Sequence, residues 1–110
     1  MFEYNAYVVD VYDGDTITCN IDCGFGVHLM KQKIRLYGIN APEMKGPERT
    51  AGGIASKNAL SNQILHKNII LKTINDKKGK YGRYLGIIYL NDVNINDWLI
   101  DNNYAKKYEL

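Results

Sequence analysis

The order of strand-like segments is the feature that most constrains the fold of this chain. Short runs rich in β-branched and aromatic residues favour strands, and turn-forming residues separate the runs. The runs are residues 4–12, 16–23, 28–39, 68–74 and 84–90. Because three runs follow one another before any helical pattern, the chain is expected to form a meander of short strands rather than an alternating β-α-β sheet.

Helical patterns interrupt this series at two places. Residues 48–66 are predicted to form a helix after the third strand, with Ile54, Leu60, Ile64 and Leu65 as its apolar positions. After the fifth strand, Asn94 or Asn96 is placed to cap a short final helix. The pattern predicts a mainly β fold with helices (α+β), namely a five-stranded OB-fold Greek-key barrel with an inserted helix after strand three and a short C-terminal helix.

Length and composition indicate a single domain over residues 1–110. No stretch approaches the roughly 20 apolar residues of a membrane span, and the start MFEYNAYVVD lacks a signal-peptide pattern. We therefore expect a cytoplasmic protein without membrane association, with secretion of a processed form as the alternative.

The two cysteines, Cys19 and Cys23, are expected to be free thiols. On one strand, four residues at ~3.3 Å each would separate their Cα atoms by about 13 Å, whereas a disulfide needs a separation below about 7 Å. A CxxxC pair with no second pair nearby is also a poor zinc site.

Charged residues are unevenly distributed along the chain, although the formal net charge is only +2. Residues 72–83 contain five basic residues and one acidic residue, a local net charge of +4, whereas acidic residues gather between positions 10 and 22 and again at 43 and 48. A basic patch beside an acidic cluster suits a phosphate substrate together with a metal. The alternative interpretation of the basic run is a solvated hairpin tip.

The stretch VYDGDTITC, residues 11–19, places two aspartates around a glycine between two predicted strands. Asp-Gly is common in hairpin turns for backbone reasons alone, so one interpretation of Asp13 and Asp15 is structural. The other is that Asp15, at the head of the second strand, points into a site. Its candidate partners are Arg35, Asn40, Glu43 and Arg83.

These residue types suit the cleavage of a phosphodiester. The reaction requires a nucleophilic water, a metal that polarises the phosphoryl oxygen, and cations for the developing charge. A planar guanidinium binds phosphate bidentately, and a site made only of oxygen ligands suits Ca²⁺.

Four segments resemble motifs of the staphylococcal nuclease (thermonuclease) family. They are DGDT at 13–16, IRLYGINAPE at 34–43, GPE at 46–48 and KYGR at 80–83, in the family's order and at similar spacings. The ending DWLIDNNYAKKY resembles the family's last helix and basic tail. The resemblance implies a calcium-dependent nuclease that hydrolyses DNA and RNA with little sequence preference and leaves 3′-phosphates. The alternative is a catalytically weak or inactive OB-fold module that binds single-stranded nucleic acid.

The resemblance also implies a metal site. Asp15 is expected to be the principal carboxylate ligand of Ca²⁺, and Asn40 and the backbone carbonyl of Ala41 further ligands. Asp13 is expected to support these ligands or to hold the turn. The family usually has aspartate where this chain has Asn40, and the lost negative charge predicts weaker calcium binding.

The remaining roles concern the substrate. By resemblance, Glu43 is the general base that activates water, and Arg35 and Arg83 contact the phosphate and stabilise the transition state. Substrate contacts are expected from Lys80, Tyr81 and Tyr108, with Tyr104 as the less favoured alternative for base stacking. The expected substrates are single-stranded or denatured DNA and RNA.

The chain stops at Leu110, whereas many family members continue into another helix packed on the barrel. We expect a monomer that lacks this helix, with an oligomer as the alternative if one face of the barrel is left exposed.

Overall fold

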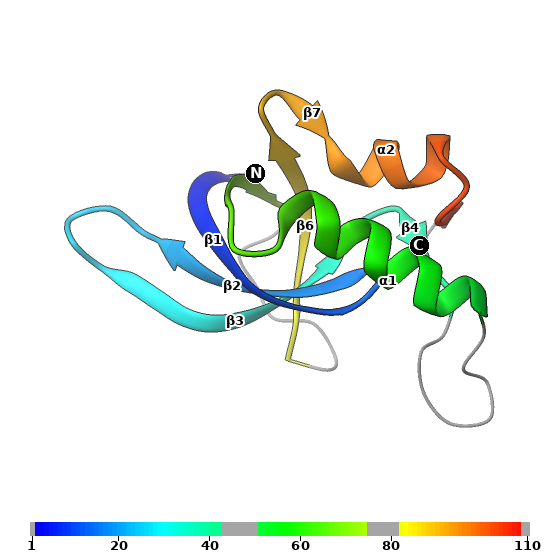
Figure 1. The fold of residues 1–110 in the computed structure, drawn as a ribbon. Coiled ribbons are helices and arrows are strands. Elements are labelled where there is room, and N and C mark those ends of the chain that lie inside the picture. Colours follow the sequence, from blue (N-terminus) through cyan, green and yellow to red (C-terminus); the bar gives the residue numbers. More distant parts are fainter. Residues whose placement is uncertain (1, 43–50, 75–81, 109–110) are drawn as a thin grey trace.

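A closed β-barrel forms the centre of the protein (Figure 1). The structure, a computed structural model, describes residues 2–42, 51–74 and 82–108. Its barrel strands are β1 (Phe2–Asp13), β2 (Thr16–Asp22), β3 (His28–Leu36), β5 (Asn68–Thr73) and β6 (Tyr84–Leu90). Antiparallel pairs join them in the order β3–β2–β1–β5–β6, and parallel pairing of β3 with β6 closes the ring. This topology confirms the predicted OB-type α+β fold.

Two helices and three very short strands complete the described part of the chain (Figure 1). They are β4 (Ile39–Asn40), α1 (Ala51–Ile64), β7 (Val93–Asn94), α2 (Ile95–Asp101) and β8 (Lys106–Lys107). The strands β4 and β8 pair with each other, and β7 extends the sheet beside β6. Neither helix of the described part of the chain has the length and the apolar composition of a membrane-spanning helix.

Helix α1 confirms the helix predicted after the third strand, although the predicted residues 48–50 lie outside the described part of the chain. Its buried face consists of Gly53, Ser56, Leu60 and Ile64, which follow the three- and four-residue spacing of one helix face. Ile54 was expected on this face, but it is 37% exposed. Small residues instead fill the first turns because the helix lies close to the barrel there.

The hairpin between β6 and β7 leads directly into α2. Asn91 and Asp92 have φ values of 50° and 67°, as a tight turn with two left-handed residues requires. Of the two candidate caps, Asn94 is the one that caps α2, because its side chain accepts a hydrogen bond from Asp97 N at 3.0 Å. Asn96 is instead 3% exposed and lies against β6.

Two irregularities in the β1–β2 pairing change which residues of β1 face outward. The first lies between Val8 and Asp10 and the second between Val11 and Asp13. Val8 and Val11 are both buried although they are three positions apart, which in a regular strand would place them on opposite faces. A bulge adds one unpaired residue and so reverses the alternation of the strand. The residues that face outward beyond the first irregularity are Asp10, Tyr12 and Asp13.

The cysteines are free thiols, as predicted. Cys19 is buried in the core, and Cys23, just beyond β2, is half-buried. Burial raises the pKa of the Cys19 thiol to about 12. Cys19 therefore behaves as a small apolar core residue.

Candidate functional site

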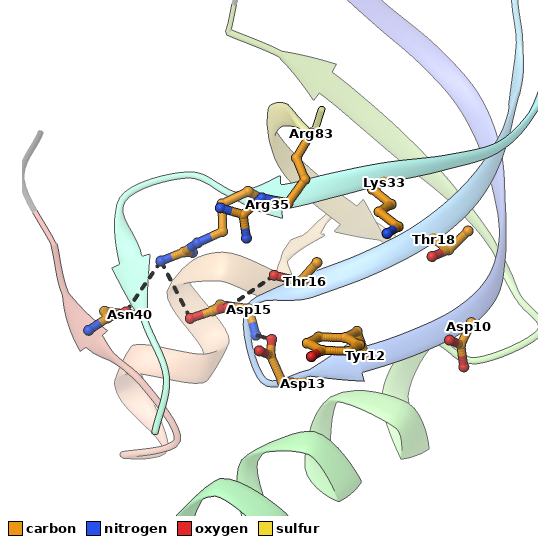
Figure 2. Close-up of a pocket in the computed structure, with 10 residues that line it drawn as sticks. All are labelled: Asp10, Tyr12, Asp13, Asp15, Thr16, Thr18, Lys33, Arg35, Asn40 and Arg83. Atoms are coloured by element: carbon orange, nitrogen blue, oxygen red, sulfur yellow. Dashed lines mark hydrogen bonds and ion pairs between the residues drawn. The ribbon is translucent and has the colours of Figure 1, made fainter. Parts of the chain in front are cut away.

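A pocket of about 600 Å³ opens on the outer face of β1, β2 and β3 (Figure 2). Its lining residues are Asp10, Tyr12, Asp13, Asp15, Thr16, Thr18, Lys33, Arg35, Asn40 and Arg83. Figure 2 shows the carboxylates along β1 and the β1–β2 turn, and the cationic side chains on β3 and at the start of β6. The pocket therefore has an acidic wall facing a basic wall.

The β1–β2 turn is held by its first aspartate. Asp13 Oδ1 accepts a hydrogen bond from Asp15 N at 3.0 Å, a side-chain-to-backbone contact typical of turns. Gly14 is needed for packing and not for a left-handed backbone. A β-carbon at this position would lie 2.7 Å from that of Ala41 and 2.8 Å from that of Ser56. The turn thus presses against the β4 segment and α1, which fixes the position of Asp15.

Asp15 is the best-connected carboxylate of the pocket. Its side chain is 9% exposed, and its Oδ2 accepts a hydrogen bond from Ala41 N at 2.8 Å and lies 3.4 Å from Arg35 Nη2. Its Oδ1 accepts a hydrogen bond from Thr16 Oγ1 at 3.2 Å. These donors and the guanidinium offset the cost of burying the charge.

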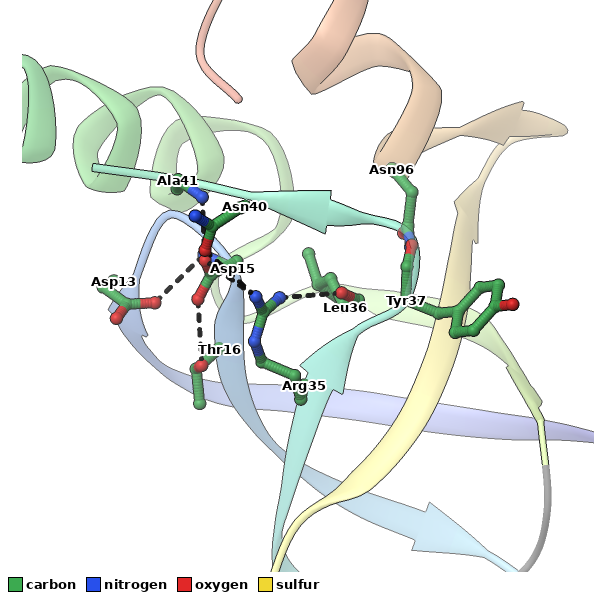
Figure 3. Close-up of polar contacts among 9 residues, drawn as sticks. All are labelled: Asp13, Asp15, Thr16, Arg35, Leu36, Tyr37, Asn40, Ala41 and Asn96. Carbon is green, nitrogen blue, oxygen red and sulfur yellow. Dashed lines mark hydrogen bonds and ion pairs between the residues drawn. The ribbon is translucent and has the colours of Figure 1, made fainter. Parts of the chain in front are cut away.

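Arg35 is oriented by acceptors at the end of β3 and on β4 (Figure 3). Its Nη1 donates to Leu36 O at 2.8 Å, and its Nη2 donates to Asn40 Oδ1 at 3.3 Å. Together with the ion pair to Asp15, these contacts fix the plane of the guanidinium. Two N–H groups or more remain for a ligand, because a guanidinium has five.

The environment also shifts the proton affinity of Asp13. Burial first, and then the hydrogen bond and the negative charge of Asp15, raise the pKa of Asp13 to about 6, although Arg35 acts in the opposite direction. Asp13 therefore takes up a proton at a higher pH than an ordinary aspartate does.

The oxygen atoms available as ligands in the pocket fit a hard cation that is bound weakly. A carboxylate offers about four lone-pair sites, and the contacts described engage three of those on Asp15. The amide oxygen of Asn40 lies on the same side of the pocket as the Asp15 carboxylate, since both contact Arg35 Nη2. Asn40 is an exposed residue. Oxygen ligands of this kind suit Ca²⁺, which completes its shell with water. The described residues contain no cluster of three or more His, Cys, Asp or Glu that could hold a metal, so one carboxylate would be the main anchor.

The pocket brings together many of the residues proposed from the sequence. Asp13, Asp15, Arg35, Asn40 and Arg83 line it, and Ala41 donates its N–H to Asp15. Glu43, Lys80 and Tyr81 lie outside the described residues, as does most of the basic patch at 72–83.

The two tail tyrosines differ in their surroundings. Tyr108 is 45% exposed and its N–H donates to Gly38 O at 2.8 Å, but Tyr108 is not among the described residues that line the pocket. Tyr104 is half-buried and stacks on Trp98 with ring centroids 5.8 Å apart. The ring of Tyr104 is thus engaged within the fold.

Sequence reasoning did not identify four lining residues, Asp10, Tyr12, Thr18 and Lys33. The period-two spacing of Thr18 with Thr16, and of Lys33 with Arg35, was a usable signal. Asp10 and Tyr12 had no such signal, because bulges decide their orientation.

Comparison with known proteins gives a consistent result. Residues 33–110 match the family model described as "Staphylococcal nuclease homologue". An uncharacterized endonuclease of Haemophilus influenzae is 35% identical, over 93% of this chain and 51% of its own length. The uncharacterized protein MJ1439 of Methanocaldococcus jannaschii is 30% identical, over 96% of this chain and 59% of its own length. A thermonuclease of Staphylococcus intermedius is 29% identical, over 92% of this chain and 58% of its own length. The chain thus spans somewhat more than half the length of these curated relatives.

Proposed function

The chain belongs to the staphylococcal nuclease family, and we propose that it is a calcium-dependent nuclease. Its proposed reaction is hydrolysis of phosphodiester bonds in single-stranded or denatured DNA and RNA, with little sequence preference and with 3′-phosphate products. The observation that carries the proposal is the convergence of Asp15, Arg35 and Arg83 in one pocket (Figure 2).

The two arginines are proposed to bind the scissile phosphate. They come from segments far apart in the sequence, and the parallel pairing of β3 with β6 sets Arg35 opposite Leu85, near the start of β6. Arg83 directly precedes β6. Two guanidinium groups on one wall can bind phosphate oxygens and stabilise the extra negative charge of the transition state.

Asp15, Asn40 and the carbonyl of Ala41 are proposed to hold the calcium ion. When bound, calcium polarises the phosphoryl oxygen and offsets developing charge. The hydrogen bonds from Ala41 N and Thr16 Oγ1 keep the Asp15 carboxylate in a fixed orientation. Because Asn40 contributes no charge, we propose that calcium binds less tightly than it would to two carboxylates.

Glu43 is proposed as the general base, and the NAPE segment that contains it supports this role through its resemblance to the family motif. The carboxylate of Glu43 takes a proton from water as the water oxygen attacks phosphorus in line with the leaving 5′-oxygen. The bond from phosphorus to the 5′-oxygen breaks as this oxygen takes up a proton from solvent to become a hydroxyl, and the phosphate stays on the 3′-side. Arg35 and Arg83 are proposed to hold the phosphoryl oxygens throughout.

Cleavage of denatured DNA by the purified chain, with calcium and with excess chelator, tests the proposal. The key variant is Glu43→Gln, and Glu3→Gln is a matched control because Glu3 is an exposed residue of β1 outside the pocket. We expect calcium-dependent cleavage that leaves 3′-phosphates. Glu43→Gln should lower the rate by about 10²- to 10⁴-fold, and Glu3→Gln should leave it unchanged.

Two results would contradict the proposal in different ways. A folded Glu43→Gln protein with wild-type rates would remove Glu43 from the reaction. A wild-type chain that binds single strands in a salt-sensitive manner without cutting them would indicate the alternative function, a nucleic-acid-binding module.

A further inference from the structure

The pocket continues along the strands beyond the proposed reaction centre. In the β1–β2–β3 register, Asp13 pairs with Thr16 and Thr16 with Arg35. One step along the same strands, Asp10 pairs with Thr18 and Thr18 with Lys33. Each row therefore carries a carboxylate on β1, a threonine on β2 and a cation on β3 (Figure 2).

The spacing of the two rows suits successive phosphates. Lys33 and Arg35 are two residues apart on β3 and face the same pocket. Two residues of a strand span about 6.7 Å, which is close to the distance between neighbouring phosphates of an extended nucleic-acid strand. When Arg35 holds one phosphate, Lys33 is in position for the next.

The ammonium group of Lys33 is available for such a contact. Lys33 is exposed, and within the described part of the chain its side chain makes no ion pair or hydrogen bond. Asp10 belongs to the same row, but β1 and β3 are two strand spacings apart, about 9–10 Å. The carboxylate of Asp10 thus leaves the Lys33 charge unpaired and confines an anion to the β3 side.

An exposed aromatic ring lies on β1 between the two rows (Figure 2). Tyr12 is 52% exposed and lines the pocket next to Asp13. Both residues face outward because the second irregularity of β1 falls between Val11 and Asp13. An exposed ring beside a phosphate site provides a platform for a base.

We propose that this extension is a second nucleotide subsite, in which Lys33 contacts the phosphate adjacent to the scissile one and Tyr12 stacks on the neighbouring base. The proposal rests on the nucleic-acid substrate proposed for the chain. It implies that substrates longer than a dinucleotide bind better, without any requirement for a particular base.

Binding of a short single-stranded thymidine oligomer, measured by fluorescence anisotropy in chelator at several salt concentrations, tests the subsite without cleavage. The variant is Lys33→Gln, and Lys67→Gln is the matched control, because Lys67 is an exposed lysine outside the pocket. We expect Lys33→Gln to weaken binding severalfold and to reduce the slope of log K against log salt by about 0.7. Lys67→Gln should change neither quantity. Tyr12→Leu should weaken binding by about fivefold or more without changing the slope.

Kinetics separate this proposal from the proposed function. In calcium, Lys33→Gln should raise KM for the oligomer and leave KM for a thymidine dinucleotide with one phosphodiester unchanged.

If Lys33→Gln and Lys67→Gln bind the oligomer equally, with the same salt slope, the subsite is refuted even where the chain cuts DNA. If the chain cuts nothing but Lys33→Gln shows the expected loss of binding, the subsite stands and the nuclease proposal fails. A wild-type chain that neither binds nor cuts refutes both.

Discussion

Replacement of Asn96 by alanine is expected to destabilise the barrel strongly. The Asn96 side chain is 3% exposed, and its Oδ1 accepts a hydrogen bond from Ile88 N at 3.2 Å. Its Nδ2 donates to Tyr37 O at 2.9 Å and to Gly86 O at 3.2 Å. Figure 3 shows Asn96 reaching Tyr37, at the end of the strand that carries Arg35. One side chain thus joins α2, β6 and the turn after β3.

The size of the effect follows from the groups that lose a partner. Gly86 O also accepts a hydrogen bond from Tyr37 N at 2.8 Å, so it keeps one partner. The N–H of Ile88 and the carbonyl of Tyr37 lose the partner that Asn96 supplies. A buried polar group without a partner costs about 1–3 kcal/mol. The bond to Ile88 N is buried, whereas the bond to Tyr37 O is part-buried, so Asn96→Ala should lower the free energy of unfolding by about 1–3 kcal/mol. A loss of this size is a large part of the free energy of unfolding of a typical domain, which is ~5–15 kcal/mol.

Asn96→Asp adds a test with a defined pH dependence. The new carboxyl keeps an acceptor for Ile88 N but turns an oxygen toward two carbonyl oxygens. Burial and these oxygens raise its folded-state pKa above the unfolded value of about 3.9. The protonated carboxyl is therefore the form compatible with folding, and the stability of the variant relative to wild type should fall as the pH rises through that raised pKa.

Urea denaturation followed by fluorescence measures these differences. Trp98 is the only tryptophan of the chain and lies on α2 with Asn96. With a urea slope of about 1–3 kcal/mol/M, Asn96→Ala should shift the midpoint by about 1 M. Asn62→Ala, an exposed position of α1, serves as the control and should stay within about 0.5 kcal/mol of wild type. An Asn96→Ala protein as stable as that control would refute the reasoning.

Two further predictions concern the turn and the thiols. Gly14→Ala should lower the free energy of unfolding by about 1–3 kcal/mol, because the new β-carbon would lie 2.7 Å from that of Ala41 and 2.8 Å from that of Ser56. An unchanged thermal midpoint would show that the turn can move away from these two residues. Ellman's reagent at pH 8 should modify Cys23 in the native protein but Cys19 only after unfolding, because burial raises the Cys19 thiol pKa to about 12. Rapid modification of both thiols would contradict the burial of Cys19.

The sequence was sufficient to predict the strand order and the barrel, because short β-branched runs and turn residues mark each element locally. It was also sufficient to identify Asn94 as one of two candidate caps. The outward orientation of Asp10 and Tyr12 could not be predicted, because it depends on bulges that form only when β1 pairs with β2. The failure at Ile54 has a similar cause, since close packing of α1 on the barrel selects small residues for its buried face.

For the site, residue types in motifs were more informative than local structure. Asp15 and Arg35 were predicted as partners, and Asp15 Oδ2 lies 3.4 Å from Arg35 Nη2. The reason for Gly14 was not apparent from the sequence. A glycine between two aspartates suggests a left-handed turn residue, whereas its neighbours in space, Ala41 and Ser56, are what exclude a side chain.

The parallel pairing of β3 with β6 has a consequence for how the chain acquires its pocket during folding. The hairpins β1–β2 and β2–β3 join neighbouring segments and can form early, whereas β3 meets β6 only after the intervening chain has been brought back. Arg83 reaches Arg35 only through this late step. An incompletely folded chain would therefore present the acidic wall together with Lys33 and Arg35 but without Arg83, and its full affinity for a phosphate chain should appear only when the ring closes. Time-resolved recovery of oligonucleotide binding would then report barrel closure itself, separately from the earlier growth of β-structure.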